Sequence, residues 1–190
     1  MSDIMSELDN IKLQISNKNF LANKGLSNEL GIHVFCYDPQ NELIVRDFIE
    51  RMTSETSDLF NVIERDLYKI FISILEEKKV VEAVIALEEK RGRDYMLTQV
   101  QNITSPDMFL SKMRYAPHNP GKDVLFLTGV GKVYPFMRSH IMLNAMQKEF
   151  SDIPIIMFYP GTFSENSLSL FNKFFDGNYY RAFNQFKLED

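Results

Sequence analysis

The stretch from residue 123 to residue 140 has the residue types and spacing in this sequence that are best suited to bind an anion. An apolar run typical of a strand leads into the turn Thr-Gly-Val-Gly-Lys at 128–132, and a helical pattern begins at residue 136. A turn between a strand and a helix gathers free backbone N–H groups at the positive end of the helix dipole. The candidate anion-binding residues are Gly129, Gly131, Lys132 and Arg138.

This turn does not satisfy the nucleotide-binding P-loop motif. That motif places four residues between its first glycine and a Gly-Lys-Ser/Thr sequence. Here Phe126 stands at the first glycine position, and Val133 stands where a hydroxyl would bind magnesium. We therefore expect no active ATPase. Two interpretations stay open: a degenerate phosphate-binding loop for a nucleotide or a nucleic acid, and a structural turn with Lys132 in solvent.

The carboxylates, the histidines and the single cysteine offer no catalytic arrangement. Asp38 and Asp66 each follow an expected strand, where a carboxylate can bind magnesium, but each also precedes a helix, where aspartate is a common N-cap. The three histidines have no second ligand at metal-binding spacing, and Cys36 lies within an apolar run. No Gly-x-Ser-x-Gly or His-Glu-x-x-His motif occurs. We therefore expect no enzyme activity, no metal site and no cofactor.

Aromatic residues gather near the C-terminus. The sequence has 16 Phe, 8 Tyr and no Trp, and seven of these aromatic residues lie between 171 and 186. This is more than one small hairpin can bury, which indicates either a protein interface or a large core that packs on the hairpin. Both interpretations stay open. The candidate partner-interface residues are Phe174, Phe175, Tyr179 and Tyr180.

The composition is that of a globular protein, with 45% hydrophobic and 25% charged residues among 190. This length suits a single domain over 1–190. No apolar run approaches the roughly 20 residues of a membrane helix, and the acidic, polar N-terminus is unlike a signal peptide. We therefore expect a cytoplasmic protein that does not contact a membrane.

The charge distribution bears on the choice of partner. The net charge of −5 argues against non-specific DNA binding by the whole surface. Residues 111–150, however, carry six Lys and Arg against two acidic residues, so the rest of the chain has a net charge of −9. Ordinary scatter of solvated cations and a local anion site on an otherwise acidic protein both fit this pattern.

Hydrophobic periodicity predicts the elements that would position these residues. Helical patterns, the first over 3–15, alternate with short buried strands. This order predicts an α/β fold, with a mostly parallel sheet and helices on both faces. Residues 64–114 are mainly helical and exceed what one crossover requires, so we expect a helical insertion or cap. The predicted strands lie at 31–37, 59–63, 123–127 and 155–159.

Several expectations concern the ends of these elements. Pro135 suits the first turn of a helix whose pattern begins at Phe136. Pro160-Gly161 is expected to end the fourth strand. Asp176-Gly177 predicts the turn of an antiparallel C-terminal hairpin that pairs 167–171 with 179–183. Ligands of open α/β sheets bind beyond the carboxyl ends of the strands, so the turn at 129–132 would face such a site.

The sequence resembles the BrxB family of BREX bacteriophage-exclusion systems. The resemblance rests on VFCYDPQNELIVRDF at 34–48, FLTGVGKVYPFMRSHIMLNAMQ at 126–147 and PIIMFYPGTF at 154–163, with SLSLF at 167–171 and YYRAF at 179–183. It implies a cytoplasmic antiphage defence protein that acts inside a larger complex. Other members of such systems include a DNA methyltransferase, an ATPase and the alkaline-phosphatase-like PglZ.

The resemblance provides no catalytic residues to carry over, which agrees with the motif search. It favours a non-catalytic assembly or adaptor protein that contacts PglZ and other BREX components and meets DNA only through the complex. Homo-oligomerisation stays open. The alternative is a ligand-binding module, in which the turn at 129–132 holds a nucleotide or nucleic acid. A metal-dependent hydrolase built on Asp38 and Asp66 ranks last, because no third ligand accompanies them.

Overall fold

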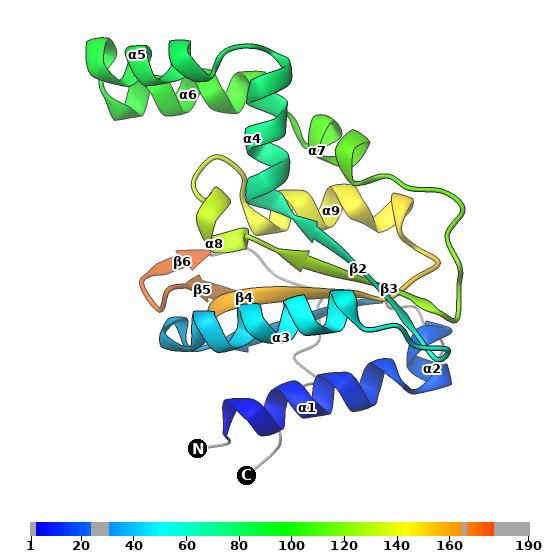
Figure 1. The fold of residues 1–190 in the computed structure, drawn as a ribbon. Coiled ribbons are helices and arrows are strands. Elements are labelled where there is room, and N and C mark those ends of the chain that lie inside the picture. The colour runs from blue at the N-terminus through cyan, green and yellow to red at the C-terminus, as the bar shows by residue number, and fades with distance from the viewer. Residues whose placement is uncertain (1–2, 24–30, 165–166, 177–190) are drawn as a thin grey trace.

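The computed structural model describes residues 3–23, 31–164 and 167–176, and the elements within these ranges form one α/β body (Figure 1). The strands are β1 (Ile32–Tyr37), β2 (Asn61–Asp66), β3 (Asp123–Thr128), β4 (Ile155–Ser164), β5 (Ser167–Leu170) and β6 (Phe174–Asp176). The helices are α1 (Ile4–Ile15), α2 (Lys18–Leu21), the 3-10 turn η1 (Pro39–Asn41), α3 (Glu42–Ser54), α4 (Leu67–Glu77), α5 (Val81–Arg91), α6 (Arg93–Ile103), α7 (Pro106–Met113), α8 (Val130–Val133) and α9 (Ser139–Glu149).

The central sheet is parallel, as the alternation of strands and helices predicts. Its order is β1-β4-β3-β2, with Ile32 opposite Ile155 in β4 and Asn61 opposite Asp123 in β3. Beyond the parallel region, β4 continues and pairs antiparallel with β5, which in turn pairs with β6. The carboxyl ends of all four parallel strands therefore lie at one edge of the sheet.

Two hydrophobic cores cover the two faces of this sheet. Side chains alternate along each strand, so Phe126 of β3 and Phe158 of β4 pack beneath α1 and α3, whereas Leu127 and Met157 pack against α4, α7 and α9. Figure 1 shows these two helical layers on opposite sides of the sheet. The predicted arrangement of helices on both faces is confirmed. None of the helices in the described ranges has the length and apolar character to cross a membrane.

The insertion between β2 and β3 is helical, and it begins at Leu67 rather than at residue 64, because β2 runs through Asp66. Helices α4 to α7 form it, and α5 and α6 project from the body as an antiparallel pair (Figure 1). Helix α5 buries none of its side chains, and Ile85 and Tyr95 on this pair are 57% and 45% exposed. Helix α6 nevertheless buries Met96 and Val100 in the core that it shares with α4, α7 and α9, so the pair joins the body through α6.

The capping interpretation of both candidate carboxylates is confirmed. Asp66 Oδ1 accepts hydrogen bonds from the backbone N–H groups of Tyr68 at 2.9 Å and Lys69 at 3.1 Å, at the start of α4. Asp38 Oδ1 accepts one from the N–H of Gln40 at 2.9 Å, at the start of η1. Each satisfies backbone donors that a helix start leaves unpaired.

Besides β2, which was expected at 59–63 and is observed at Asn61–Asp66, two predicted element ends were wrong. The helix expected from Phe136 begins at Ser139, because the chain first makes the single turn α8 and Pro135 cannot donate a backbone hydrogen bond that would extend it. Strand β4 does not end at Pro160-Gly161 but runs to Ser164. The carbonyl of Pro160 accepts from Phe171 N at 2.8 Å, and a Cβ on Gly161 would lie 2.1 Å from the carbonyl oxygen of Ser169, so glycine here permits close strand pairing.

The C-terminal hairpin is antiparallel, as predicted, but it uses other residues. Strand β5 pairs with β4 on one edge and with β6 on the other, and the predicted partner 179–183 lies outside the described residues. The turn between β5 and β6 falls at 171–173, where Phe171 and Asn172 have φ of 54° and 57°, and Asp176 lies within β6. The predicted interface residues Tyr179 and Tyr180 lie outside the described residues.

His33, in β1, gives the fold a pH dependence. Its side chain is 7% exposed and its ring centroid lies 4.8 Å from that of Phe20. Burial lowers the pKa of His33 to about 4, so the unfolded chain takes up a proton while the folded chain does not. Stability at this site therefore falls as pH drops from 7, and we expect a loss of about 2 kcal/mol by pH 5. Urea unfolding at both pH values should show a smaller loss for His33→Gln, and an equal loss would contradict this.

Candidate functional site: a cleft at the carboxyl edge of the sheet

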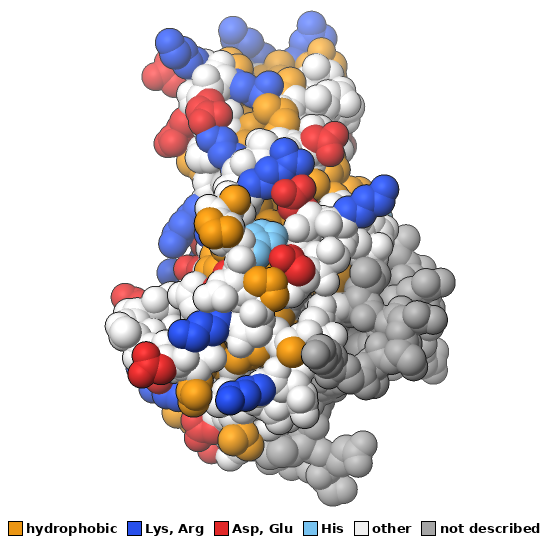
Figure 2. Space-filling view, turned by 90° about the vertical axis from the view of Figure 1, so that its right-hand side faces the viewer, with side chains coloured by type: hydrophobic (Ala, Val, Ile, Leu, Met, Phe, Trp, Pro, Cys, Tyr) orange, Lys and Arg blue, Asp and Glu red, His pale blue; other side chains and the backbone are white. Residues whose placement is uncertain are grey.

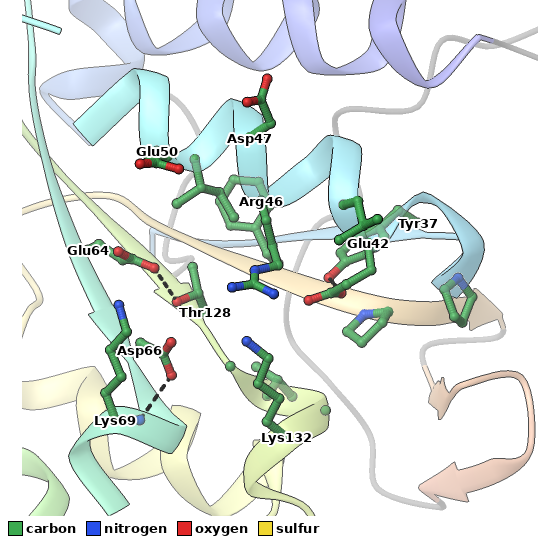
Figure 3. Close-up of a pocket in the computed structure, with 18 of the residues that line it drawn as sticks. Tyr37, Glu42, Arg46, Asp47, Glu50, Glu64, Asp66, Lys69, Thr128 and Lys132 are labelled. Atoms are coloured by element: carbon green, nitrogen blue, oxygen red, sulfur yellow. Dashed lines mark hydrogen bonds between the residues drawn. The ribbon is translucent and has the colours of Figure 1, made fainter. Parts of the chain in front are cut away.

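A cleft of about 810 Å³ opens where the four parallel strands end. Helix α3 forms one wall, the junction of β2 with α4 forms the other, and the β3–α8 turn lies between them (Figure 3). The position is the one expected for a ligand site in an open α/β sheet. The volume lies within the range of about 300 to 1,000 Å³ that is typical of small-molecule pockets.

Three cationic side chains enter the cleft from three separate helices. Arg46 comes from α3, Lys69 from the first turn of α4 and Lys132 from α8, and Figure 3 shows all three pointing toward the shared space. Within the described part of the chain, none of the three makes an ion pair with an acidic residue. All three are solvent-exposed, so a ligand can reach their charged ends.

Carboxylates also line the cleft, but most of them are engaged by the fold. Glu42 accepts from Tyr37 Oη at 2.7 Å, Glu64 accepts from Thr128 Oγ1 at 2.7 Å, and Asp66 caps α4. Burial and then the contact with Glu42 raise the pKa of Tyr37, which keeps its hydroxyl protonated as the donor. Asp47 pairs with Arg51 at 3.3 Å. Of the lining carboxylates, Glu50 remains without such a contact to the described residues.

The two glycines of the turn have packing roles. Gly129 has φ of +72°, and a Cβ there would lie 2.2 Å from Asp66 Oδ1. A Cβ on Gly131 would lie 2.6 Å from the ring of Phe171. The Asp66 carboxylate thus lies directly against Gly129. A degenerate phosphate-binding loop would place a phosphate at this point. Helix α8 is a single turn and contributes little dipole.

The structure brings together only part of the predicted anion-binding set. Gly129, Gly131 and Lys132 line the cleft, whereas Arg138 is the N-cap residue of α9 and is not among the lining residues. Arg46 and Lys69 were missed by sequence reasoning. The sequence offered only one weak indication for them. Each residue lies within two turns of the start of a helix that follows a predicted strand, but the helical faces that carry them are otherwise ordinary charged surfaces.

The candidate interface aromatics lie at one end of the sheet. Phe174 and Phe175 are in β6, with 48% and 73% of their surface exposed. The Phe174 ring contacts Tyr134, with centroids 5.3 Å apart. Phe175 has the larger exposed fraction, and an exposed aromatic residue on a short strand is a common feature of protein interfaces.

The basic residues of 111–150 do not converge on one place. Lys112 pairs with Glu77, Arg114 pairs with Glu149 at 3.0 Å, and Lys132 lies in the cleft. Figure 2 views the side of the molecule at the amino ends of the strands, and positive and negative side chains are interspersed there. On that face, no continuous basic surface of the kind that follows a nucleic-acid backbone is visible.

No arrangement for metal catalysis occurs in the ranges that the structure describes. Within them, no group of three or more His, Cys, Asp or Glu side chains is placed to hold a metal ion. Cys36 is a buried free thiol in β1. His118 lies away from the cleft, where its Nδ1 contacts Asp152 at 2.8 Å.

Comparison with known proteins covers nearly the whole chain. The sequence model of the family described as BREX protein BrxB matches residues 63–185. A BREX protein BrxB of Bacillus cereus (strain H3081.97) is 40% identical over 190 residues, which covers 96% of this chain and 97% of the relative. A BREX protein BrxB of Escherichia coli O9:H4 (strain HS) is 30% identical over 176 residues, covering 93% and 88%. No solved structure matches.

The matched range contains the elements that build most of the cleft, from the end of β2 through α4, the β3–α8 turn and β4. The relatives align with the first third of the chain as well, which includes α3 and Arg46. On these grounds the chain belongs to the BrxB family and is a component of a BREX system.

Proposed function

We propose that this protein is a non-catalytic adaptor of a BREX antiphage complex and that it binds the PglZ-type component directly. The observation that carries the proposal is family membership over almost the entire length of the chain. A BREX component of one domain needs surfaces for other components, and the aromatic residues of β6 offer such a surface. The proposal also includes a cytoplasmic location and contact with DNA only through the complex.

The exposed pair Phe174 and Phe175 is the proposed contact point. Aromatic side chains contribute large, rigid contact area and often dominate binding energy. Phe175 is the better probe, because its 73% exposure means that its removal should barely change stability. The proposed contact also includes Tyr179 and Tyr180, because they are aromatic and follow closely in the sequence.

The test is co-expression with the PglZ-type protein of the same BREX system, followed by size-exclusion chromatography with light scattering. We expect co-elution at a defined mass, and loss of co-elution for the double variant Phe174→Ala/Phe175→Ala. Leu13→Ala is the matched control, since Leu13 is 71% exposed on α1. Separate elution of the unmodified proteins would contradict binding to PglZ, and an intact complex of the double variant would contradict the β6 contact.

A degenerate phosphate-binding loop built on the backbone of Gly129 to Gly131 has less support. The Asp66 carboxylate is in contact with Gly129, and a second negative charge at that point would be repelled. Any ligand role for the cleft must therefore depend on its cationic side chains.

A further inference from the structure

The carboxylates and the cations of the cleft differ in how many contacts they make within the fold. Four of the five carboxylates that line it already accept hydrogen bonds or pair with a cation within the fold. The three cations have no such partner among the described residues. The unused binding capacity is therefore cationic. Charged donors that converge from separate elements favour a ligand with several anionic oxygens.

Apolar side chains also line part of the cleft. Leu43 lines it from the first turn of α3 and is 76% exposed, which is unusual for a leucine beside a core. Proline and aromatic side chains continue this wall from η1, β4 and the β5–β6 turn. The apolar wall consists of Leu43, Pro39, Pro160, Phe171 and the ring of Tyr37.

We propose that the cleft binds a phosphorylated small molecule of nucleotide size, with its phosphates between Arg46, Lys69 and Lys132 and its flat or apolar part against the Leu43 wall. The volume of about 810 Å³ accommodates such a ligand. The cleft is lined by both charged and apolar side chains, so it can contact both parts of such a ligand. The inference is independent of the adaptor role and does not require hydrolysis.

A mononucleotide suits this cleft better than a nucleic-acid strand. Glu50 lines the cleft without a cationic partner among the described residues, so it would repel the phosphates of a longer strand. The whole chain also has a net charge of −5, which opposes polymer binding at a distance. A short ligand can place its phosphates among the three cations and avoid both costs.

The test is isothermal titration calorimetry of the full-length protein with ADP, and with pyrophosphate and adenosine as its two halves. We expect ADP to bind more tightly than either half. Arg46→Gln, Lys69→Gln and Lys132→Gln should each weaken ADP binding about tenfold or more, because each removes a charged donor. All three residues are exposed, so the variants should keep their fold, which thermal unfolding will verify.

Two further variants separate the parts of the proposal. Leu43→Ser should weaken ADP binding and leave pyrophosphate binding unchanged, since Leu43 contacts only the apolar part. Arg138→Gln should leave both unchanged, because Arg138 is exposed but does not line the cleft. Arg138→Gln removes the same charge as Arg46→Gln. Comparing the two variants therefore tests whether Arg138, predicted from the sequence, or Arg46, which lines the cleft, binds the ligand.

Three results would overturn the proposal. The first is that neither ADP nor pyrophosphate binds at ligand concentrations up to about 1 mM. The second is ADP binding that persists when all three cations are replaced together. The third is that a single-stranded oligonucleotide binds more tightly than ADP and that its binding is lost in the same variants. This result would assign the cleft to nucleic acid.

Discussion

Replacing Asp123 by alanine is expected to lower the free energy of unfolding by about 3 to 5 kcal/mol. The Asp123 side chain sits at the amino end of β3 and is 2% exposed. Its carboxylate accepts three hydrogen bonds at 2.9 Å, from Asn61 Nδ2, Tyr115 Oη and the backbone N–H of Asn119. Alanine would leave all three donors without their acceptor in a place where water has little access.

The bond from Asn61 is long-range, whereas Tyr115 and Asn119 precede Asp123 by only eight and four residues. Asn61 begins β2, and Tyr115 and Asn119 belong to the loop that returns from α7 to β3. The contact with Tyr115 is reinforced, because Arg65 lies over its ring at 5.5 Å and donates from Nε to the carbonyl of Met113 at 2.8 Å. Burial, followed by the bond to Asp123, raises the pKa of Tyr115 and keeps its hydroxyl a donor.

A graded series checks this interpretation by urea unfolding. Tyr115→Phe removes one donor and should cost about 1 kcal/mol. Asp152→Ala is the matched control, since that carboxylate is 44% exposed and contacts only His118 within the described residues, so we expect a loss below about 1 kcal/mol. A cost for Asp123→Ala no larger than that of Asp152→Ala would show that the network contributes little.

The sequence was sufficient for the parts of the fold that depend on local pattern. Strands β1 and β3 and the parallel part of β4 were recognisable because each is an apolar run, whereas β2 is half polar and only its first half was predicted. Asp38 and Asp66 were recognisable as caps because a cap acts within three residues. The strand end expected at Pro160-Gly161 was wrong for a tertiary reason. Glycine there allows close contact with Ser169 of β5, a partner that local sequence does not reveal.

The cleft was predictable in position but not in composition. The rule that ligands bind at the carboxyl edge located the Gly129 turn correctly beside it. Arg46 and Lys69 are far from this turn in sequence and look like ordinary solvated residues of amphipathic helices. Only the parallel packing of β1, β2 and β3 brings α3, α4 and α8 around one space. Asp123 escaped attention for the same reason, since its three donors meet it only in the folded chain.

The Gly129→Ala variant is expected to lose about 3 kcal/mol of stability, from two sources. At φ of +72° a side chain costs about 1 to 2 kcal/mol in any surroundings. The added Cβ would also meet Asp66 Oδ1 at 2.2 Å and the backbone N of Tyr68 at 3.0 Å, so the cap of α4 must shift. Urea unfolding measures the sum of these costs.

Gly121→Ala isolates the first of these costs. Gly121 has φ of +86°, but a Cβ there would have no neighbour within 4 Å, so the expected loss is only about 1 kcal/mol. Combining Gly129→Ala with Asp66→Ser should recover part of the difference, because serine still caps a helix while its shorter side chain withdraws from the Cβ. Equal losses at the two glycines would mean that Asp66 adjusts freely. In that case contact with Asp66 does not explain the glycine at position 129, and phosphate binding by the backbone of the turn would again be a possible explanation.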